Sequence, residues 1–131
     1  MIRRHRLSGR RRFAAVRTAG FRASSGSVRS QLAGNGLDVA RVGFALVGLR
    51  SAVRRNLLRR RLREAVRPLL GGLAGYDVVL VAGIEALELP FCALREAVEK
   101  ATNRTVERSR RAPAGSTADN GPMTTSAGLG R

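Results

Sequence analysis

The segment from Val53 to Leu69 constrains the fold most, because its residues sort onto two distinct sides of an α-helix. With about 100° between successive residues, the apolar side chains share an arc of roughly 100°, the width of a core-facing stripe. They are Leu58, Leu62, Ala65, Val66 and Leu69. An adjoining arc of about 140° stacks polar side chains in steps of four. We call these residues the arginine ladder: Arg55, Asn56, Arg59, Arg60, Arg63 and Arg67.

The arginine ladder has very little negative charge beside it. The segment from Arg54 to Arg67 contains seven arginines, both ends included, but only one acid, Glu64. Like charges four residues apart destabilise a helix by ~0.2–0.5 kcal/mol per pair, so a partner that supplies counter-charge is expected. A basic side that simply faces water is the alternative, but such sides normally mix both signs. The ladder therefore favours a phosphate-rich partner.

The excess positive charge of the whole chain lies in its N-terminal half, which contains the arginine ladder. The chain has a net charge of +16 and a pI near 12.0. Residues 1–67 hold 18 arginines against two acids, which already gives +16, whereas seven bases and seven acids cancel in residues 68–131. An excess confined to one half predicts a basic face on a compact domain, as proteins that bind polyanions have.

Composition excludes several other classes of protein. Hydrophobic residues make up 44% of the chain, which is enough for a core, but aromatics are only 4% and Trp is absent, so the core is aliphatic. The single cysteine, Cys92, excludes an internal disulfide and a thiolate metal cluster. No apolar run approaches the ~20 residues of a membrane span. The start, Met1 to Arg6, is a basic arm rather than a signal peptide. We expect a cytoplasmic protein without a membrane partner.

The remaining elements are predicted from local patterns. Residues 10–19 form a helix with Ser8 as N-cap and Gly20 as a left-handed stop. Strands follow at 27–33 and 41–47, separated by the turn Gly34-Asn35-Gly36. The continuous apolar run within 77–82 is typical of a strand buried on both faces. A last helix begins at Pro90, has Phe91, Leu94, Val98 and Ala101 on one side, and fades over 104–111.

These elements predict an α+β fold, a small α/β sandwich in the order helix, two or three strands, helix, strand, helix. From Ala112 onward the composition changes to Ala, Gly, Ser, Thr and Pro, which cannot offset the entropy of ordering. We therefore expect a basic, phosphate-binding domain over 1–111 and a disordered tail over 112–131.

No catalytic or metal-binding constellation can be built from the sequence. His5 is the only histidine and is placed on the basic arm, and Cys92 is expected to be a buried or half-buried small hydrophobe. The acids Glu85, Glu88, Glu96 and Glu99 are spread over the neutral half of the chain, so they form no set of metal ligands. We therefore expect neither catalytic residues nor a metal site in the protein itself.

Several motifs, in order, resemble those of the bacterial ribonuclease P protein family. Residues 52–64, Ala-Val-Arg-Arg-Asn-Leu-Leu-Arg-Arg-Arg-Leu-Arg-Glu, are similar to the family helix A-V-x-R-N-R-x-K-R-x-x-R-E. Arg6-Leu7 with Phe13, Val16 and Gly20 resembles its N-terminal pattern. Further similar stretches are Arg41-Val42-Gly43, Gly75-Tyr76-Asp77-Val78-Val79, and Leu89-Pro90-Phe91 with Leu94.

The resemblance implies a fold and a function. The fold would have a left-handed βαβ crossover around the basic helix, similar to the ribosomal protein S5 domain 2-like fold. The partners would be a catalytic RNA subunit and precursor tRNA, whose 5′ leader is removed by an endonucleolytic cut, and no DNA is expected. The RNA would carry the chemistry and hold most of the Mg²⁺.

The resemblance also implies which residues bind RNA. The residues facing the catalytic RNA would be Arg50, Arg54, Arg55, Asn56, Arg59, Arg60, Arg63 and Arg67. The leader would contact Arg10, Phe13 and Arg17 in a cleft beside the first helix.

The chain departs from the family pattern at three places. Leu57 replaces one family cation, the segment 47–51 is about one residue short and has Arg50 in place of a lysine, and Arg17 stands where a second aromatic is usual. Arg17 can stack its guanidinium on a base instead. A structural RNA- or ribosome-binding protein without a processing role is the alternative. A membrane-surface amphipathic helix would need bulky aromatic anchors, which the helix predicted from Val53 to Leu69 lacks.

Overall fold

The apolar run around Val78 lies inside a four-stranded sheet, as predicted. The computed structural model describes residues 5–111. Its strands are β1 (Phe21–Ser25), β2 (Val28–Gly34), β3 (Arg41–Leu46) and β4 (Tyr76–Ala82), in the spatial order β1-β2-β4-β3. β2 pairs with β1 and β4 in antiparallel fashion, whereas β3 and β4 are parallel. The turn at Gly34–Gly36 therefore joins two strands that are not neighbours.

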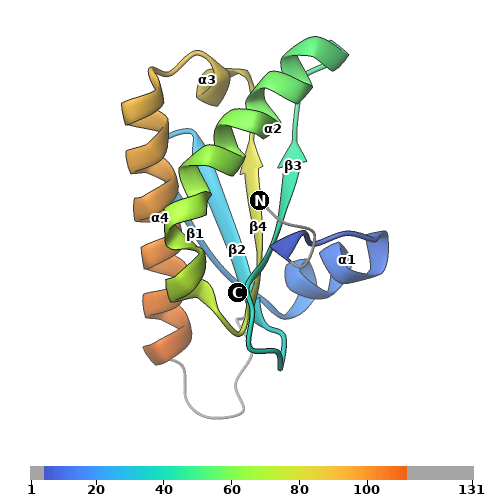
Figure 1. Cartoon of the computed structure of the whole chain (residues 1–131). Helices are drawn as coiled ribbons and strands as arrows, with labels where there is room; N and C mark the ends of the chain where they lie inside the picture. Colours follow the sequence, from blue (N-terminus) through green and yellow to red (C-terminus); the bar gives the residue numbers. More distant parts are fainter. Residues whose placement is uncertain (1–4, 112–131) are drawn as a thin grey trace, which may run out of the picture.

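Two long helices cover one face of this sheet (Figure 1). They are α2 (Ala52–Val66), which continues as the 3-10 helix η2 (Arg67–Leu73), and α4 (Phe91–Arg111). The short helix α3 (Ile84–Leu87) leads from β4 towards α4. The helix α1 (Arg10–Ala19) lies on the opposite face of the sheet.

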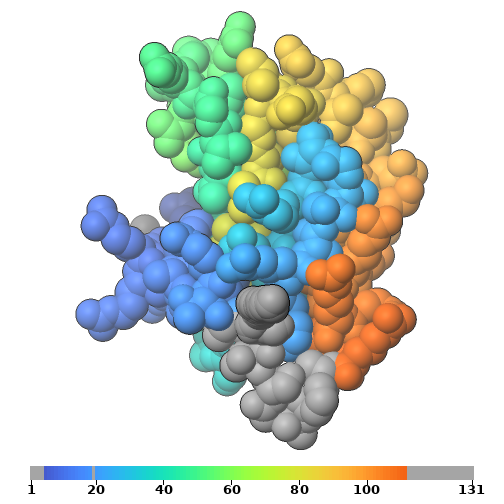
Figure 2. Space-filling model, turned by 180° about the vertical axis from the view of Figure 1, so that it is seen from behind, coloured from blue at the N-terminus to red at the C-terminus, as the bar shows by residue number. Residues whose placement is uncertain are grey.

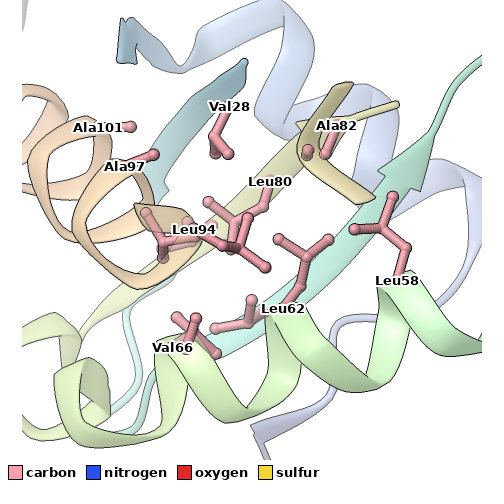
Figure 3. Close-up of a cluster of buried hydrophobic side chains, with 14 of the residues drawn as sticks. Val28, Leu58, Leu62, Val66, Leu80, Ala82, Leu94, Ala97 and Ala101 are labelled. Atoms are coloured by element: carbon pink, nitrogen blue, oxygen red, sulfur yellow. The ribbon is translucent and has the colours of Figure 1, made fainter. Parts of the chain in front are cut away.

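Alternation along the strands separates two apolar clusters. Val78 and Leu80 of β4 point towards the two long helices and belong to one cluster with Leu58, Leu62 and Leu94, all fully buried. Figure 3 shows Leu58, Leu62, Leu80 and Leu94 in this cluster. Val79 points the other way, onto α1. A strand buried on both faces needs apolar residues at successive positions, and β4 has them.

The crossover from β3 through α2 to β4 is left-handed. Seen from the helix side with both strands pointing upward, the chain passes from β3 to β4 on its left, with α2 in front (Figure 1). About 98% of such connections are right-handed, so this hand is a distinctive feature of the fold. The predicted α+β sandwich is confirmed, and the crossover is left-handed, as the family resemblance implied.

Helix α1 approaches the sheet closely at two glycines. A Cβ on Gly43 of β3 would lie 2.3 Å from Cζ of Phe13, so the ring rests directly on that glycine. A Cβ on Gly20 would lie 2.3 Å from the carbonyl oxygen of Val16 and 2.8 Å from that of Leu32. At each glycine an added Cβ would fit only if its neighbour moved. From the side of the molecule that carries α1, the strands β1 and β2 are visible beside that helix (Figure 2).

Some boundaries and caps differ from the predictions. Gly20 is extended, with φ −86°, so the left-handed stop was wrong. The cap position of α1 is Gly9, with φ 95°, rather than Ser8. β1 was not predicted as a separate range because Ala23, Ser24 and Ser25 carry little apolar signal. α4 continues to Arg111 instead of fading from Arg104.

Two side chains also lie elsewhere than predicted. Cys92 is exposed rather than buried or half-buried, and its neighbour Phe91 in the first turn of α4 is 40% exposed. His5 is held in place: its Nδ1 donates to the carbonyl oxygen of Ala40 at 2.8 Å. The backbone after it follows β3, with Leu7 N–H donating to the Val42 carbonyl oxygen at 2.9 Å.

Two sequence predictions concern membranes and the tail. Within the described residues, no helix has the length and apolar character needed to cross a membrane. The predicted tail at 112–131 lies outside the residues that the structure describes.

Candidate nucleic-acid interface

The basic helix α2 starts clear of the core. Ser51 caps it, since its Oγ accepts from the backbone N–H of Arg54 at 3.3 Å. Residues 52–57 are all exposed, and burial begins only at Leu58. The first turn and a half of α2 therefore presents its side chains to the outside.

The arginine ladder lies along the uncovered side of α2. Arg55, Asn56 and Arg60 are exposed, while Arg59 and Arg63 are half-buried. Arg59 donates to Oδ1 of Asn56 at 3.2 Å, which aligns neighbouring members of the ladder. Leu58, Leu62, Ala65 and Val66 of the predicted apolar stripe are buried on the other side of α2. Leu69, the last member of that stripe, lies half-buried in η2 beyond the end of α2.

Acids are nearly absent from the ladder. Glu64 accepts from Arg67 at 2.9 Å, and both side chains are about half exposed. Within residues 5–111, no ion pair engages Arg55, Arg59, Arg60 or Arg63. Four guanidinium groups thus face outward without a carboxylate partner.

Arg61 differs from its neighbours because it holds the fold together. Its guanidinium donates to the carbonyl oxygens of Leu87 and Leu89, both at 2.5 Å, which ties α2 to the α3–α4 connection. Arg54 precedes Arg61 by seven residues and lies on the same side of the helix, off the ladder. Arg50 is exposed in the loop before α2.

A hollow of about 190 Å³ connects the ladder with α1 around the edge of β3. Arg59 and Arg63 line it from α2, and Phe13 lines it from α1. The other lining residues are Arg6, Leu7, Val42, Gly43 and Phe44. Two groups of predicted RNA-binding residues, far apart in the sequence, therefore meet at one edge of the sheet.

Helix α1 offers one aromatic side chain and exposed cations. Phe13 is half-buried on Gly43, and Arg10 and Arg17 are exposed. These two arginines are seven residues apart and so lie on one side of the helix. Arg17 also adjoins the outer strands, where Arg22 donates to its carbonyl oxygen at 2.8 Å.

One acid near this edge is already committed to the fold. Asp77 is buried and accepts from Nε and Nη2 of Arg41, both at 2.8 Å, and from Nδ2 of Asn35 at 3.0 Å. The hydrogen bond to Asp77 raises the pKa of Arg41 above its ordinary value, against the opposing effect of desolvation. The pair fixes the start of β3 to β4 and leaves Asp77 engaged inside the protein.

The site contains no cluster of typical metal ligands. In the part of the chain from His5 to Arg111, no three His, Cys, Asp or Glu side chains gather to hold an ion. What the arrangement offers is a set of cations and one aromatic ring, which suits binding of phosphates and bases.

Sequence reasoning missed Arg6 as a site residue. Arg6 is exposed, forms a bridge with Val42 and lines the same hollow as Arg59. The Arg-rich start of the chain indicated a basic arm, but the alignment of Arg6 along β3 depends on backbone pairing that no local pattern reveals.

Comparisons with known proteins agree on one family. The family model described as Ribonuclease P matches residues 1–106. The ribonuclease P protein component of Symbiobacterium thermophilum is 41% identical over 110 residues, covering 79% of this chain and 93% of the relative. That of Chloroflexus aggregans is 40% identical over 99 residues, covering 72% and 73%.

Solved structures of the same family share the fold. The RNase P protein from Thermotoga maritima matches with a TM-score of 0.65 and 29% identity, covering 72% of this chain and 94% of that one. The protein from Staphylococcus aureus matches with a TM-score of 0.69 over 76% of this chain and 94% of its own, and at 19% identity it supports the fold alone. With its family motifs, its sandwich fold and these relatives, the chain belongs to the bacterial ribonuclease P protein family, the protein component of a ribonucleoprotein endoribonuclease of tRNA 5′ maturation.

Proposed function

We propose that this chain binds the ribonuclease P RNA through the arginine ladder of α2 and holds the 5′ leader of precursor tRNA beside α1. The observation that carries the proposal is the hollow at the β3 edge, where Arg59 and Arg63 of the ladder meet Phe13 of α1. A phosphate backbone along α2 and a single strand on Phe13 would then be close neighbours. In this arrangement the protein would hold the leader of precursor tRNA next to the catalytic RNA.

The ladder is suited to a folded RNA. Unpaired guanidinium groups bind phosphate oxygens in bidentate fashion, and the release of counterions from the RNA makes the binding strongly dependent on salt. Arg50 and Arg54 extend the cationic surface around the exposed N-terminal end of α2. Arg67 would join it by exchanging Glu64 for a phosphate.

The leader side is suited to a single strand. One base can stack on Phe13, which is worth ~1–3 kcal/mol by alanine substitution. Arg10 and Arg17 would contact the neighbouring phosphates or stack on a base. With one aromatic rather than several, the leader would be bound mainly through its backbone.

The protein would assist the cut without performing it. Phosphodiester hydrolysis by metal ions needs oxygen ligands that position divalent cations. In the proposal, the RNA subunit supplies most of these ligands and holds Mg²⁺. The protein would supply cations that lower the repulsion between two RNA molecules.

A reconstituted cleavage assay tests this function. At low Mg²⁺, adding the protein to its RNA subunit should raise the rate of leader removal from precursor tRNA, because protein cations replace part of the screening by Mg²⁺. The double variant Arg59→Ala, Arg63→Ala should lose most of this gain. The matched control is Arg95→Ala, Arg110→Ala, which removes the same charge from exposed positions on α4.

The outcomes separate this function from its alternative. If the wild-type protein binds the RNA but never accelerates cleavage, the chain is a structural RNA-binding protein and the proposal is wrong. Equal losses in both double variants would show that only net charge matters, which would also contradict it.

A further inference from the structure

A second set of arginines lies away from the ladder, at the outer edge of β1. Nη1 of Arg104 on α4 donates to the carbonyl oxygen of Ser24 at 2.6 Å. Nη1 of Arg108, one turn further along α4, donates to the carbonyl oxygen of Arg22. Arg22 in turn donates to the carbonyl oxygen of Arg17. We call Arg22, Arg104 and Arg108 the β1-edge cluster.

The spacing of the cluster follows from the two elements that carry it. Ser24 and Arg22 are two residues apart, so their carbonyls repeat every ~6.6 Å along the free edge of β1. Arg104 and Arg108 are four residues apart, which places them ~6 Å apart along α4. The two repeats match, and each guanidinium is therefore held by its own carbonyl at a fixed position.

The cluster has unused binding capacity. An arginine has five N–H donors, and the carbonyl contacts use only one on each residue. All three side chains are exposed. Among the residues that the structure describes, no carboxylate pairs with them, since the α4 acids Glu96 and Glu107 pair with Lys100 and Arg111.

The cluster is continuous with the predicted leader site. Arg22 is anchored on Arg17, the last leader-contact candidate of α1. Seen from the face that carries α1, the strands β1 and β2 lie between α1 and the C-terminal end of α4 (Figure 2). A single-stranded RNA leader that runs from Phe13 past Arg17 would reach Arg22 next, and then Arg108 and Arg104.

We propose that the β1-edge cluster binds backbone phosphates of the 5′ leader, at nucleotides farther from the cleavage site than those on Phe13. This inference rests on the proposed function and names the substrate segment that the second surface takes. Guanidinium groups fixed by carbonyls lose little freedom on binding, and they contact phosphates without reading bases. The protein thus distinguishes long from short leaders, independently of their sequence.

The same contacts also have a structural effect, because β1 is an edge strand. Guanidinium groups on its free carbonyls prevent pairing with another chain. The experiment must therefore separate charge from carbonyl capping. Glutamine can still donate to a carbonyl but has no charge, whereas lysine keeps the charge.

The test measures affinity of the reconstituted holoenzyme for precursor tRNAs whose leaders are lengthened one nucleotide at a time. Wild-type affinity should rise in a second step once the leader is long enough to reach the cluster. Arg104→Gln, Arg108→Gln should remove that step, weakening long-leader binding by roughly five- to tenfold, as expected for two exposed charge contacts. Arg104→Lys, Arg108→Lys should keep most of it. The control Arg95→Gln, Arg110→Gln should match the wild type.

Salt dependence gives an independent measurement. For long leaders, the slope of log K against log salt should fall by about 0.7 for each phosphate that the Gln variant no longer binds. A weakening that is the same for every leader length would assign the cluster to the RNA subunit and overturn the inference. So would a wild-type series without the second step. Failure of the proposed function looks different, because cleavage would then gain nothing from the protein at any leader length.

Discussion

Two glycines decide how α1 sits on the sheet, and they do so against different neighbours. Gly20 meets backbone oxygens of Val16 and Leu32, which cannot move without disturbing the helix and the strand. Gly43 meets only the tip of the Phe13 ring, which can rotate away. An added methyl group should therefore affect stability at Gly20 and function at Gly43.

The contrast can be measured with Gly20→Ala and Gly43→Ala. Gly20→Ala should lower the free energy of unfolding by about 2–3 kcal/mol, the usual cost of overpacking. Gly43→Ala should stay within about 1 kcal/mol of the wild type, since alanine favours a strand over glycine by a similar amount. It should nevertheless weaken leader binding, because the ring is displaced. Denaturant unfolding and leader affinity would check this; equal destabilisation by both would contradict it.

At the scale of one element, α2 combines arginines of two kinds. Arg60 faces outward on the ladder, whereas Arg61 donates to two backbone carbonyls of the α3–α4 connection. Adjacent residues on a helix point about 100° apart, so one side chain can serve binding while the next serves the fold.

Alanine at these two adjacent positions should have opposite effects. Arg61→Ala leaves two carbonyl oxygens without their partner and should cost about 1–3 kcal/mol of stability, with RNA affinity of the folded protein unchanged. Arg60→Ala should change stability by no more than about 0.5 kcal/mol. It should reduce the salt slope of RNA binding by roughly one. Unfolding curves and RNA titrations over a range of salt would test the pair. A lower stability for Arg60→Ala, or weaker RNA binding by folded Arg61→Ala, would show that the roles are misassigned.

Across the whole molecule, unbalanced charge opposes compactness. The chain has a net charge of +16, and Arg59 and Arg63 of the ladder lie near the β3 edge of the sheet, whereas the β1-edge cluster lies at the opposite edge. Cations brought together by folding repel each other, so the free protein is less stable than its aliphatic core alone would make it.

Screening this repulsion should raise the melting temperature. Between about 0.01 M and 0.15 M salt the Debye length shortens from ~30 Å to ~8 Å, which weakens repulsion across the molecule. We expect Tm to rise with salt, and to rise further with a short RNA that binds only the folded state. Thermal melts monitored by circular dichroism would measure both. A Tm that falls with salt would mean that attractive pairs such as Arg41–Asp77 outweigh the repulsion.

Local patterns determined most of the elements of this protein. Periodicity predicted the helix around Leu62, the strand buried on both faces around Val79, and the ladder. An element that is buried on one side or on both has apolar residues at regular positions in the sequence. The family motifs supplied the left-handed crossover, which no periodicity encodes. The strand β1 has almost no apolar periodicity in its sequence, since its residues are mostly small or polar and lie at the edge of the sheet.

Only the tertiary structure decided which distant residues meet. It placed Phe13 beside Arg59 and Arg63 through pairing of Arg6 and Leu7 with β3. It also brought Arg104 and Arg108, from the electrically neutral half of the chain, to the edge of β1. Periodicity tells which side of an element is buried, but the neighbour of each side depends on strand order and crossover hand. Those are set by the packing of the whole sheet.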